Sequence, residues 1–312
     1  MLAATCGAVA TGPAAAQGYP NRPIRLILPF PPGGPVDGMA RLLGPKLSAA
    51  FKQSVVLDNR PGASGMIGID TTVRANPDGY TITMVSSSYA ASAATSQLSH
   101  DPLTETAPII LLGVAPQLAV VHPSVPIANA RELIAHARAN PGKLNYGSSG
   151  TGGSVHLTVE YLTQMAGISM THVPYKGQAP ALNDVIGGQI QVLSGSPMII
   201  YPHVKSNRLR AIAVTSAKRS NAMPEIPAFA ETVPGFESLS WQAVLGPKAL
   251  PKDIAVRWNT ELNLILQLPE TRERMAGDSM EVAGGPPERF LDQLKRDVAK
   301  WQKVVKVANI RL

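Results

Sequence analysis

The chain has 312 residues, a length that suits two lobes better than one core. A hydrophobic content of 45% and a charged content of 16% are typical of a soluble globular protein and exclude a disordered one. The net charge of +7 comes from scattered Lys and Arg, without the basic runs and interleaved aromatics of nucleic-acid binders. No apolar stretch reaches the length of a transmembrane helix.

The N-terminal segment, residues 1–17, is small, apolar and uncharged, and we interpret it as the remnant of a signal peptide. Its AAAQ stretch supplies the small residues that a signal peptidase requires, although the charged beginning of such a peptide is missing. The only cysteine, Cys6, lies in this segment. The mature chain would therefore have neither a disulfide nor a reactive thiol, which is compatible with export.

The first part of the chain alternates strands with helices. An apolar run at 24–28 predicts a strand, and the helical spacing of Met39, Leu43 and Leu47 predicts the helix after it. Further strands are expected in SVVLDN, in YTITMVSSS and, as a pair, in ETAPIILLGVAPQLAVVHP. This alternation favours an α/β fold with mostly parallel strands.

The second part repeats the opening pattern. A helix at 130–139 leads to a strand at 144–147, and a glycine- and serine-rich loop then opens a helix with Leu157 and Leu162 on its apolar face. Strands are expected in ISMTHVPYKG, QIQVLSG, LRAIAVTS and ESLSWQAVLGP, and helices in APALNDVIGG and MIIYPHVKSN and at 254–268, 270–276 and 287–308. Two glycine-rich turns from strand to helix indicate two similar lobes.

These two turns carry the chemistry that we expect. The first N–H groups of a helix have no partner within it and lie at the positive end of its dipole, so a bare loop before a helix suits an anion. Loop one offers amides from Gly33 to Asp37, and loop two, at 148–154, adds four hydroxyls. Neither loop contains Lys or Arg, and nucleotide-binding glycine motifs are absent. A carboxylate is therefore favoured over a phosphate, although either turn alone can simply connect a strand to a helix.

The sequence contains few features that would support a catalytic role. The chain lacks a G-x-S-x-G elbow, and its six histidines lack the spacing of zinc ligands. Ser154 and His156 are two residues apart near a helix start, so they would not face each other. Asp37 is expected to order loop one, whereas Tyr175 and Lys176 either contact the ligand or form a solvated turn. An α/β enzyme acting on a carboxylate or an ester stays open as the alternative.

Seven stretches, among them RPIRLILPFPPGGPVDGMARLL, NYGSSGTGGSVHLTVEYL and HVPYKGQAPALNDVIGGQI, resemble the Bug family of periplasmic solute-binding proteins of tripartite tricarboxylate transporters. The resemblance runs from about Tyr19 to Leu312. It implies a two-lobed periplasmic-binding-protein fold of type II, a Venus flytrap whose two Rossmann-like lobes are joined by two crossing strands. Lobe 1 is expected at 18–119 plus 243–312 and lobe 2 at 120–242.

The resemblance also implies where the ligand lies. Loop one and loop two would hold one carboxylate from opposite lobes, partly through water, and more variable positions would meet the far end of the ligand. These positions are Ser86 to Tyr89 after the TITMV strand and Gly195 to Met198 after IQVL, and Trp241 is a further candidate. The residues expected to bind the ligand are Phe30, Gly33, Gly34, Pro35, Asp37, Ser87, Ser88, Ser149, Thr151, Gly152, Ser154, His156, Ser196 and Met198. The SGSPM stretch carries no acid, so an α-amino acid is a less suitable ligand.

The function implied is that of a monomeric periplasmic receptor, without cofactor, metal or nucleic acid. It would capture a dicarboxylate, a tricarboxylate or an aromatic carboxylate by lobe closure and deliver it to the membrane permease subunits of a tripartite transporter. Hinges are expected near 118–121 and 239–243. A binding protein that serves a sensor kinase is the alternative with the same fold.

Overall fold

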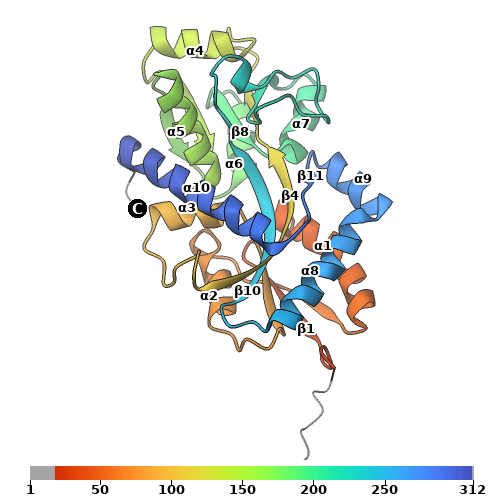
Figure 1. Ribbon diagram of the computed structural model, residues 1–312. Coiled ribbons are helices and arrows are strands. Elements are labelled where there is room, and N and C mark those ends of the chain that lie inside the picture. The colour runs from red at the N-terminus through yellow and green to blue at the C-terminus, as the bar shows by residue number, and fades with distance from the viewer. Residues whose placement is uncertain (1–17, 311–312) are drawn as a thin grey trace, which may run out of the picture.

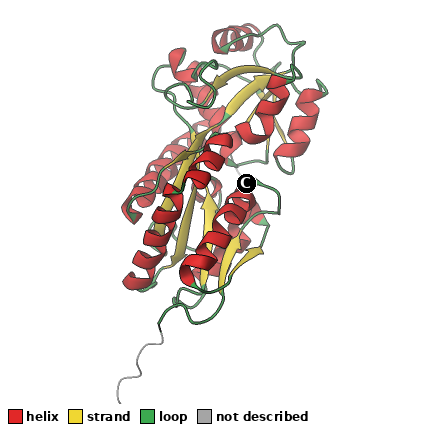
Figure 2. Ribbon diagram, turned by 90° about the vertical axis from the view of Figure 1, so that its right-hand side faces the viewer, coloured by secondary structure: helices red, strands yellow, loops and turns green. Residues whose placement is uncertain are grey.

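The computed structural model describes residues 18–310, so the expected signal-peptide remnant at 1–17 and Cys6 lie outside the described residues. The described chain forms two α/β lobes, one above the other in Figures 1 and 2. Within this part of the chain, no helix is both long and apolar enough to cross a membrane.

Lobe 1, the lower lobe in Figure 1, is built on a six-stranded sheet with the order β11-β4-β10-β3-β1-β2. Strand β1 pairs in parallel with β2 and β3, whereas β10 runs antiparallel between β3 and β4. The strands are β1 (Ile24–Leu28), β2 (Val55–Asn59), β3 (Thr81–Ser86), β4 (Thr106–Pro116), β10 (Leu239–Pro247) and β11 (Glu281–Val282).

Helices cover both faces of this sheet. On one face, α1 (Pro35–Phe51), α8 (Lys252–Gln267) and α9 (Pro269–Gly277) bury apolar side chains against the strands. On the other face lie α2 (Met66–Val73), α3 (Ser88–Thr95) and α10 (Pro287–Ala308), with the short 3₁₀ turn η1 (Ala63–Gly65) before α2. Helix α1 begins with a proline, which suits a first helical residue because its missing N–H would have no partner there.

Lobe 2 is a five-stranded sheet with the order β7-β6-β8-β5-β9. Its strands are β5 (Leu118–Val121), β6 (Asn145–Ser148), β7 (Thr171–Pro174), β8 (Val192–Gly195) and β9 (Arg210–Val214). Helices α4 (Ala130–Ala139) and α5 (Ser154–Ala166) and the 3₁₀ turn η2 (Phe229–Glu231) share one apolar core. A second core holds α6 (Gln178–Ile186) and α7 (Pro197–Lys205).

The chain passes between the lobes twice, and buried hydrogen bonds tie the two crossings together. Gln117, only 1% exposed, donates through Nε2 to Thr158 (3.0 Å) and accepts at Oε1 from Ser194 (3.0 Å). Its backbone N–H donates to Thr215 Oγ1, which itself donates to the carbonyl of Ser238 at the second crossing. We call these five residues the crossing network.

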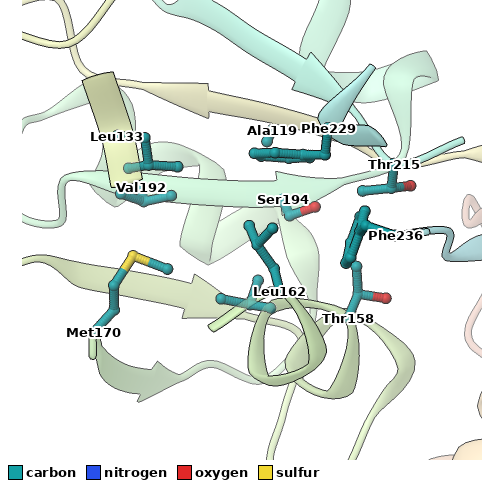
Figure 3. A pocket seen from close by; sticks show the side chains of 11 residues that line it. Ala119, Leu133, Thr158, Leu162, Met170, Val192, Ser194, Thr215, Phe229 and Phe236 are labelled. Atoms are coloured by element: carbon teal, nitrogen blue, oxygen red, sulfur yellow. The ribbon is translucent and has the colours of Figure 1, made fainter. Parts of the chain in front are cut away.

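A small cavity adjoins the crossing network inside lobe 2, with a volume of about 10 Å³. Figure 3 shows Thr158, Ser194 and Thr215 at its edge and apolar side chains such as Leu162 and Phe236 around it. A space this small reaches only the lower limit for one water molecule, so it is a packing defect and not a ligand site.

The lobes also touch through helices. Leu157 and Tyr161 of α5 belong to the apolar cluster that includes Trp301 of α10, and the Tyr161 and Trp301 rings meet edge to face at 6.2 Å. In Figure 1, α10 runs across the molecule beside α3 and α5. Helix α10 therefore belongs to lobe 1, because it follows β11 of that lobe and packs into the apolar core of that lobe, and it also contacts lobe 2 through α5.

Several expected elements have the observed bounds, including β1, α4 and α10. Most strands run in one direction within each sheet, as expected, whereas β5 and β10, the strands at the crossings, run antiparallel to both of their neighbours. Helix α3 and strand β11 were not expected. The lobe boundaries placed after residues 119 and 242 divide β5 and β10, whereas the chain changes sheet at Gln117 and ahead of Leu239.

One buried carboxylate attaches α10 to the sheet, and its removal should destabilise the protein. Asp297, 2% exposed, accepts from Trp241 Nε1 at 2.7 Å and pairs with Lys300 at 3.0 Å. Asp297→Ala leaves the indole N–H without an acceptor, which should lower the free energy of unfolding by about 1–3 kcal/mol in urea titrations. Asp292→Ala, at an exposed aspartate of the same helix, is the control and should change it little.

Candidate ligand-binding site

The carboxyl ends of the parallel strands in both sheets meet at the crossings. Strands β1 and β3 are parallel, and β4 runs in the same direction because it opposes β10, so all three end at one edge of lobe 1. In lobe 2, β6, β7 and β8 are parallel, and Leu118 at the start of β5 pairs with Gly195 at the end of β8. Only Gln117 separates β4 from β5, so these two edges adjoin each other.

Loop one follows β1 and is ordered by a single carboxylate. Asp37, 3% exposed in the first turn of α1, accepts from the N–H of Gly33 (3.0 Å) and from Nε of Arg41 (2.7 Å). Asn59 at the end of β2 donates to the carbonyl of Phe30 (2.9 Å) and to Asp37 (3.3 Å). The hydrogen bond from Arg41 lowers the pKa of Asp37, so the carboxyl group stays ionised and its charge is balanced locally.

Loop two follows β6 and is ordered by a histidine. His156, 4% exposed in the first turn of α5, accepts from the N–H of Gly152 at Nδ1 (3.0 Å). Ser148 Oγ bonds to His172 Nε2 (2.6 Å) and accepts from the N–H of Gly150 (3.2 Å). The loop is therefore held from the helix that follows it and from the neighbouring strand β7.

The two loops share one local design, which the sequence shows as G-G-P-V-D and G-G-S-V-H. In each, the first glycine has a positive φ, 86° at Gly33 and 73° at Gly152, which favours glycine. In each, its N–H donates to the side chain four residues later. The N–H groups of the first helical turn stay without partners inside the helix, so each lobe presents a positive helix end at its carboxyl edge.

The buried His156 and the half-buried His172 stack on each other beside loop two. Their ring centres are 3.8 Å apart and their planes differ by 11°. Burial, and for His156 also the neighbouring His172, lowers the pKa of each ring to about 4. Both rings are therefore neutral near pH 7, as the acceptor role of His156 requires. Tyr146 stacks on His172 at 5.1 Å and donates to Glu160.

The remaining expected residues lie at the same two edges. Ser87 and Ser88 follow β3, and the backbone N–H of Ser87 donates to the carbonyl of Trp241 (3.0 Å). Ser196 and Met198 follow β8, with Ser196 before α7 and Met198 half-buried within it. Ser149 and Thr151 are exposed in loop two, and Ser154 begins α5.

Four expectations need correction. The N–H groups of Gly33 and Gly152 do not point to an anion, because each donates to a side chain of its own loop. Tyr89, 1% exposed, bonds to His100 at 2.7 Å, and Trp241, 1% exposed, donates to Asp297, so both are core residues. The donors left in the first turns are the N–H groups of Val36, Asp37, Ser154, Val155 and His156.

Two glutamines at these edges were not expected from the sequence. Gln178 Nε2 and Gln242 Oε1 are buried without a hydrogen-bond partner among the described residues. Gln178 starts α6, and Gln242 lies on β10 opposite Ser86 at the end of β3. Gln178 lies in the HVPYKGQAPALNDVIGGQI stretch, but nothing in that stretch marks it as a site residue, since the strand order and register bring both glutamines to the carboxyl edges.

Two sheets joined by two crossings, with a helix N-terminus at the carboxyl edge of each, define a two-lobed solute-binding protein. The chain belongs to the family described as "Tripartite tricarboxylate transporter family receptor", whose family model matches residues 39–310. The family is one of receptors, the similar protein BugD is described as a periplasmic binding protein, and the expected resemblance to Bug proteins is confirmed.

Full-length relatives support this assignment. Protein BugT of Bordetella pertussis is 33% identical, with 100% of this chain and 96% of that protein covered. The structure described as R. palustris Rpa4515 with adipate has a TM-score of 0.86 at 33% identity, covering 94% of this chain and 99% of that one. The periplasmic binding protein BugD gives 0.83 at 31% identity, with the same coverage.

The histidine stack predicts a loss of stability in acid. Between about pH 6.5 and pH 4 the unfolded chain binds protons on histidines that stay neutral in the folded protein. The free energy of unfolding is therefore not reduced by these histidines above about pH 6.5. It should fall as the pH drops through this window, from about 6.5 to about 4. Urea titrations across it measure the slope.

Removing one ring of the stack should flatten this slope. We expect His172→Gln to lose less stability than the wild type between the two ends of the window. The control is His136→Gln on α4, which removes a histidine that lies outside the stack. Equal slopes in the wild type and in His172→Gln would contradict the assignment.

Proposed function

We propose that this protein is a periplasmic receptor that captures a small organic acid between its lobes and delivers it to a tripartite tricarboxylate transporter. One carboxylate of the ligand accepts hydrogen bonds from loop one and loop two together. Dicarboxylates, tricarboxylates and aromatic carboxylates form the expected substrate class. The receptor works as a monomer, and its partners are the membrane permease subunits of the transporter.

The observation that carries this proposal is the pair of matching helix starts at adjoining sheet edges. Each lobe contributes N–H groups from the first turn of a helix, and neither loop contains a lysine or arginine. Hydrogen bonds to a charged group are each worth about 1.5–3 kcal/mol. Three or four such bonds offset much of an association cost of about 4–15 kcal/mol, and apolar contacts supply the remainder. A relative at 33% identity is described with adipate, which agrees with a carboxylate ligand.

Capture requires the lobes to close, and the crossings are the natural hinges. The chain passes between the sheets at Gln117 and ahead of Leu239, where the crossing network links both passages. A hinge motion at these positions changes the distance between loop one and loop two without disturbing either sheet. The ligand stabilises the closed state because only there do both loops contact it.

A panel of acids tests the proposal. The purified protein is heated with monocarboxylates, dicarboxylates, tricarboxylates and aromatic carboxylates, and at least one acid should raise the melting temperature in a concentration-dependent manner. The matching amides, which carry no charge, should not raise it. Mass spectrometry of each acid after incubation separates binding from turnover. Hydrolysis of an ester without any shift by acids would support the enzyme alternative instead.

A proline substitution tests the N–H donors of loop two. Gly153 before α5 has φ −74° and ψ 166°, close to φ −84° and ψ 174° at Gly34, which precedes Pro35 in loop one. The backbone at Ser154 therefore accommodates proline, and Ser154→Pro should fold while it lacks one N–H. Its affinity for the best acid should fall about tenfold or more in titration calorimetry.

The matched control for this variant is Ser154→Ala, which removes the hydroxyl and keeps the N–H. The affinity lost in Ser154→Ala measures the contribution of the hydroxyl group to binding. The additional affinity lost in Ser154→Pro measures the contribution of the N–H group. Equal affinities for the two variants, with unchanged melting temperatures, would show that this N–H does not contact the ligand.

A further inference from the structure

Gln178 presents an unused donor within the candidate site. Its Oε1 accepts the N–H of Ser196 at 3.2 Å, which fixes the orientation of the carboxamide. Its Nε2 is buried and has no hydrogen-bond partner among the described residues. A buried amide N–H without an acceptor is costly, so a group in this position points to a partner that binds there.

Strand order places this donor in the middle of the lobe 2 edge. Gln178 follows β7, while Gly195 and Ser196 lie at the end of β8, and β6 lies between these two strands. The Gln178 side chain reaches from the end of β7 to the end of β8. It therefore passes over the carboxyl end of β6, where loop two begins. The donor therefore lies at the carboxyl end of β8, beside Ser196 and one strand away from the start of loop two.

Gly195 makes room for this arrangement. A Cβ at position 195 would lie 1.8 Å from Gln178 Nε2 and 2.5 Å from its Cδ. No other residue fits there without moving the carboxamide, because every other side chain begins with a Cβ. The close contact between the backbone of β8 and the amide keeps Nε2 in place.

We propose that Gln178 is a specificity-determining residue of this site, donating Nε2–H to an oxygen at the far end of the bound acid. This inference rests on the proposed function and adds the class of the second ligand group. That group is an oxygen acceptor, such as a carboxylate, keto or hydroxyl oxygen. An ammonium group has no lone pair to accept the bond, and a methyl end leaves the N–H without a partner.

The chemistry of the edge supports a far-end oxygen. Gln178 is held by Ser196, which itself stands at the N-terminal end of α7, where the helix dipole is positive. No aspartate or glutamate occurs in the SGSPM stretch from 194 to 198 that could pair with an ammonium group. Both features favour a negatively polarised atom over a positively charged one at this end of the ligand.

Acids of equal length with different ends test the proposal. Calorimetry compares diacids from succinate to pimelate with the monoacids and ω-amino acids of the same chain length. At the best length, the wild type should bind the diacid at least about tenfold more tightly than the monoacid, the effect of one hydrogen bond to a charged group. The ω-amino acid should bind no better than the monoacid.

Gln178→Glu should reverse this order. The glutamate keeps an acceptor for the Ser196 N–H but replaces the donor with a negative charge. We expect it to bind the diacid at least about tenfold more weakly than the wild type, to leave the monoacid unchanged and to bind the ω-amino acid more tightly. Gln178→Met, which removes the donor without a charge, should abolish the preference of diacid over monoacid.

Gln189→Glu is the matched control, because it adds the same charge at an exposed glutamine just after α6. It should keep the wild-type preferences. If Gln178→Glu and Gln178→Met also keep them while melting like the wild type, Gln178 has no role in specificity and the inference is overturned, although the receptor function stands. If no acid binds the wild type, the proposed function itself fails.

Discussion

The two-lobed arrangement depends on the crossing network around Gln117. A glutamine that is 1% exposed must have its carboxamide satisfied inside the protein, and here the hydroxyls of Thr158 and Ser194 satisfy both of its ends. Thr215 connects the backbone N–H of Gln117 to the carbonyl of Ser238. These bonds form only when both crossings lie side by side in one register. That register sets the carboxyl edges of the two sheets, with their glycine loops, against each other.

Both lobes use the same turn with a different acceptor at its end. Asp37 is ionised and balanced by Arg41, whereas His156 is neutral and rests on His172. Each acceptor orders its glycine loop from within, and the N–H groups of the first helical turn have no partner inside the helix. The proposed anion site would consist of the dipoles of these N–H groups, because the neighbouring Arg41 is already paired with Asp37. Such a site suits a receptor that has to release its ligand again, because neutral donors bind a carboxylate less tightly than an arginine pair does.

The sequence predicted most of the elements and the two loops, because periodicity and the position of glycine are local properties. It did not predict that Gly33 and Gly152 are already paired, since this depends on the rotamers of Asp37 and His156. Trp241 was placed near the ligand because it lies close to a crossing, but alternation along β10 turns it towards α10. Gln178 was not predicted because its position at the carboxyl edge comes from the strand order, which is a property of the whole sheet.

The position of β10 has a consequence for biosynthesis. This strand lies between β3 and β4, which are made far earlier and do not pair with each other directly. Until residues 239–247 leave the ribosome, the first sheet has an open gap in its middle, with two unpaired edges. The inserted lobe, by contrast, is continuous from β5 to β9 and can complete its pairing without later segments. Native structure in the N-terminal lobe is thus delayed until most of the polypeptide exists, which keeps the nascent chain unfolded for longer than its early strands alone would suggest.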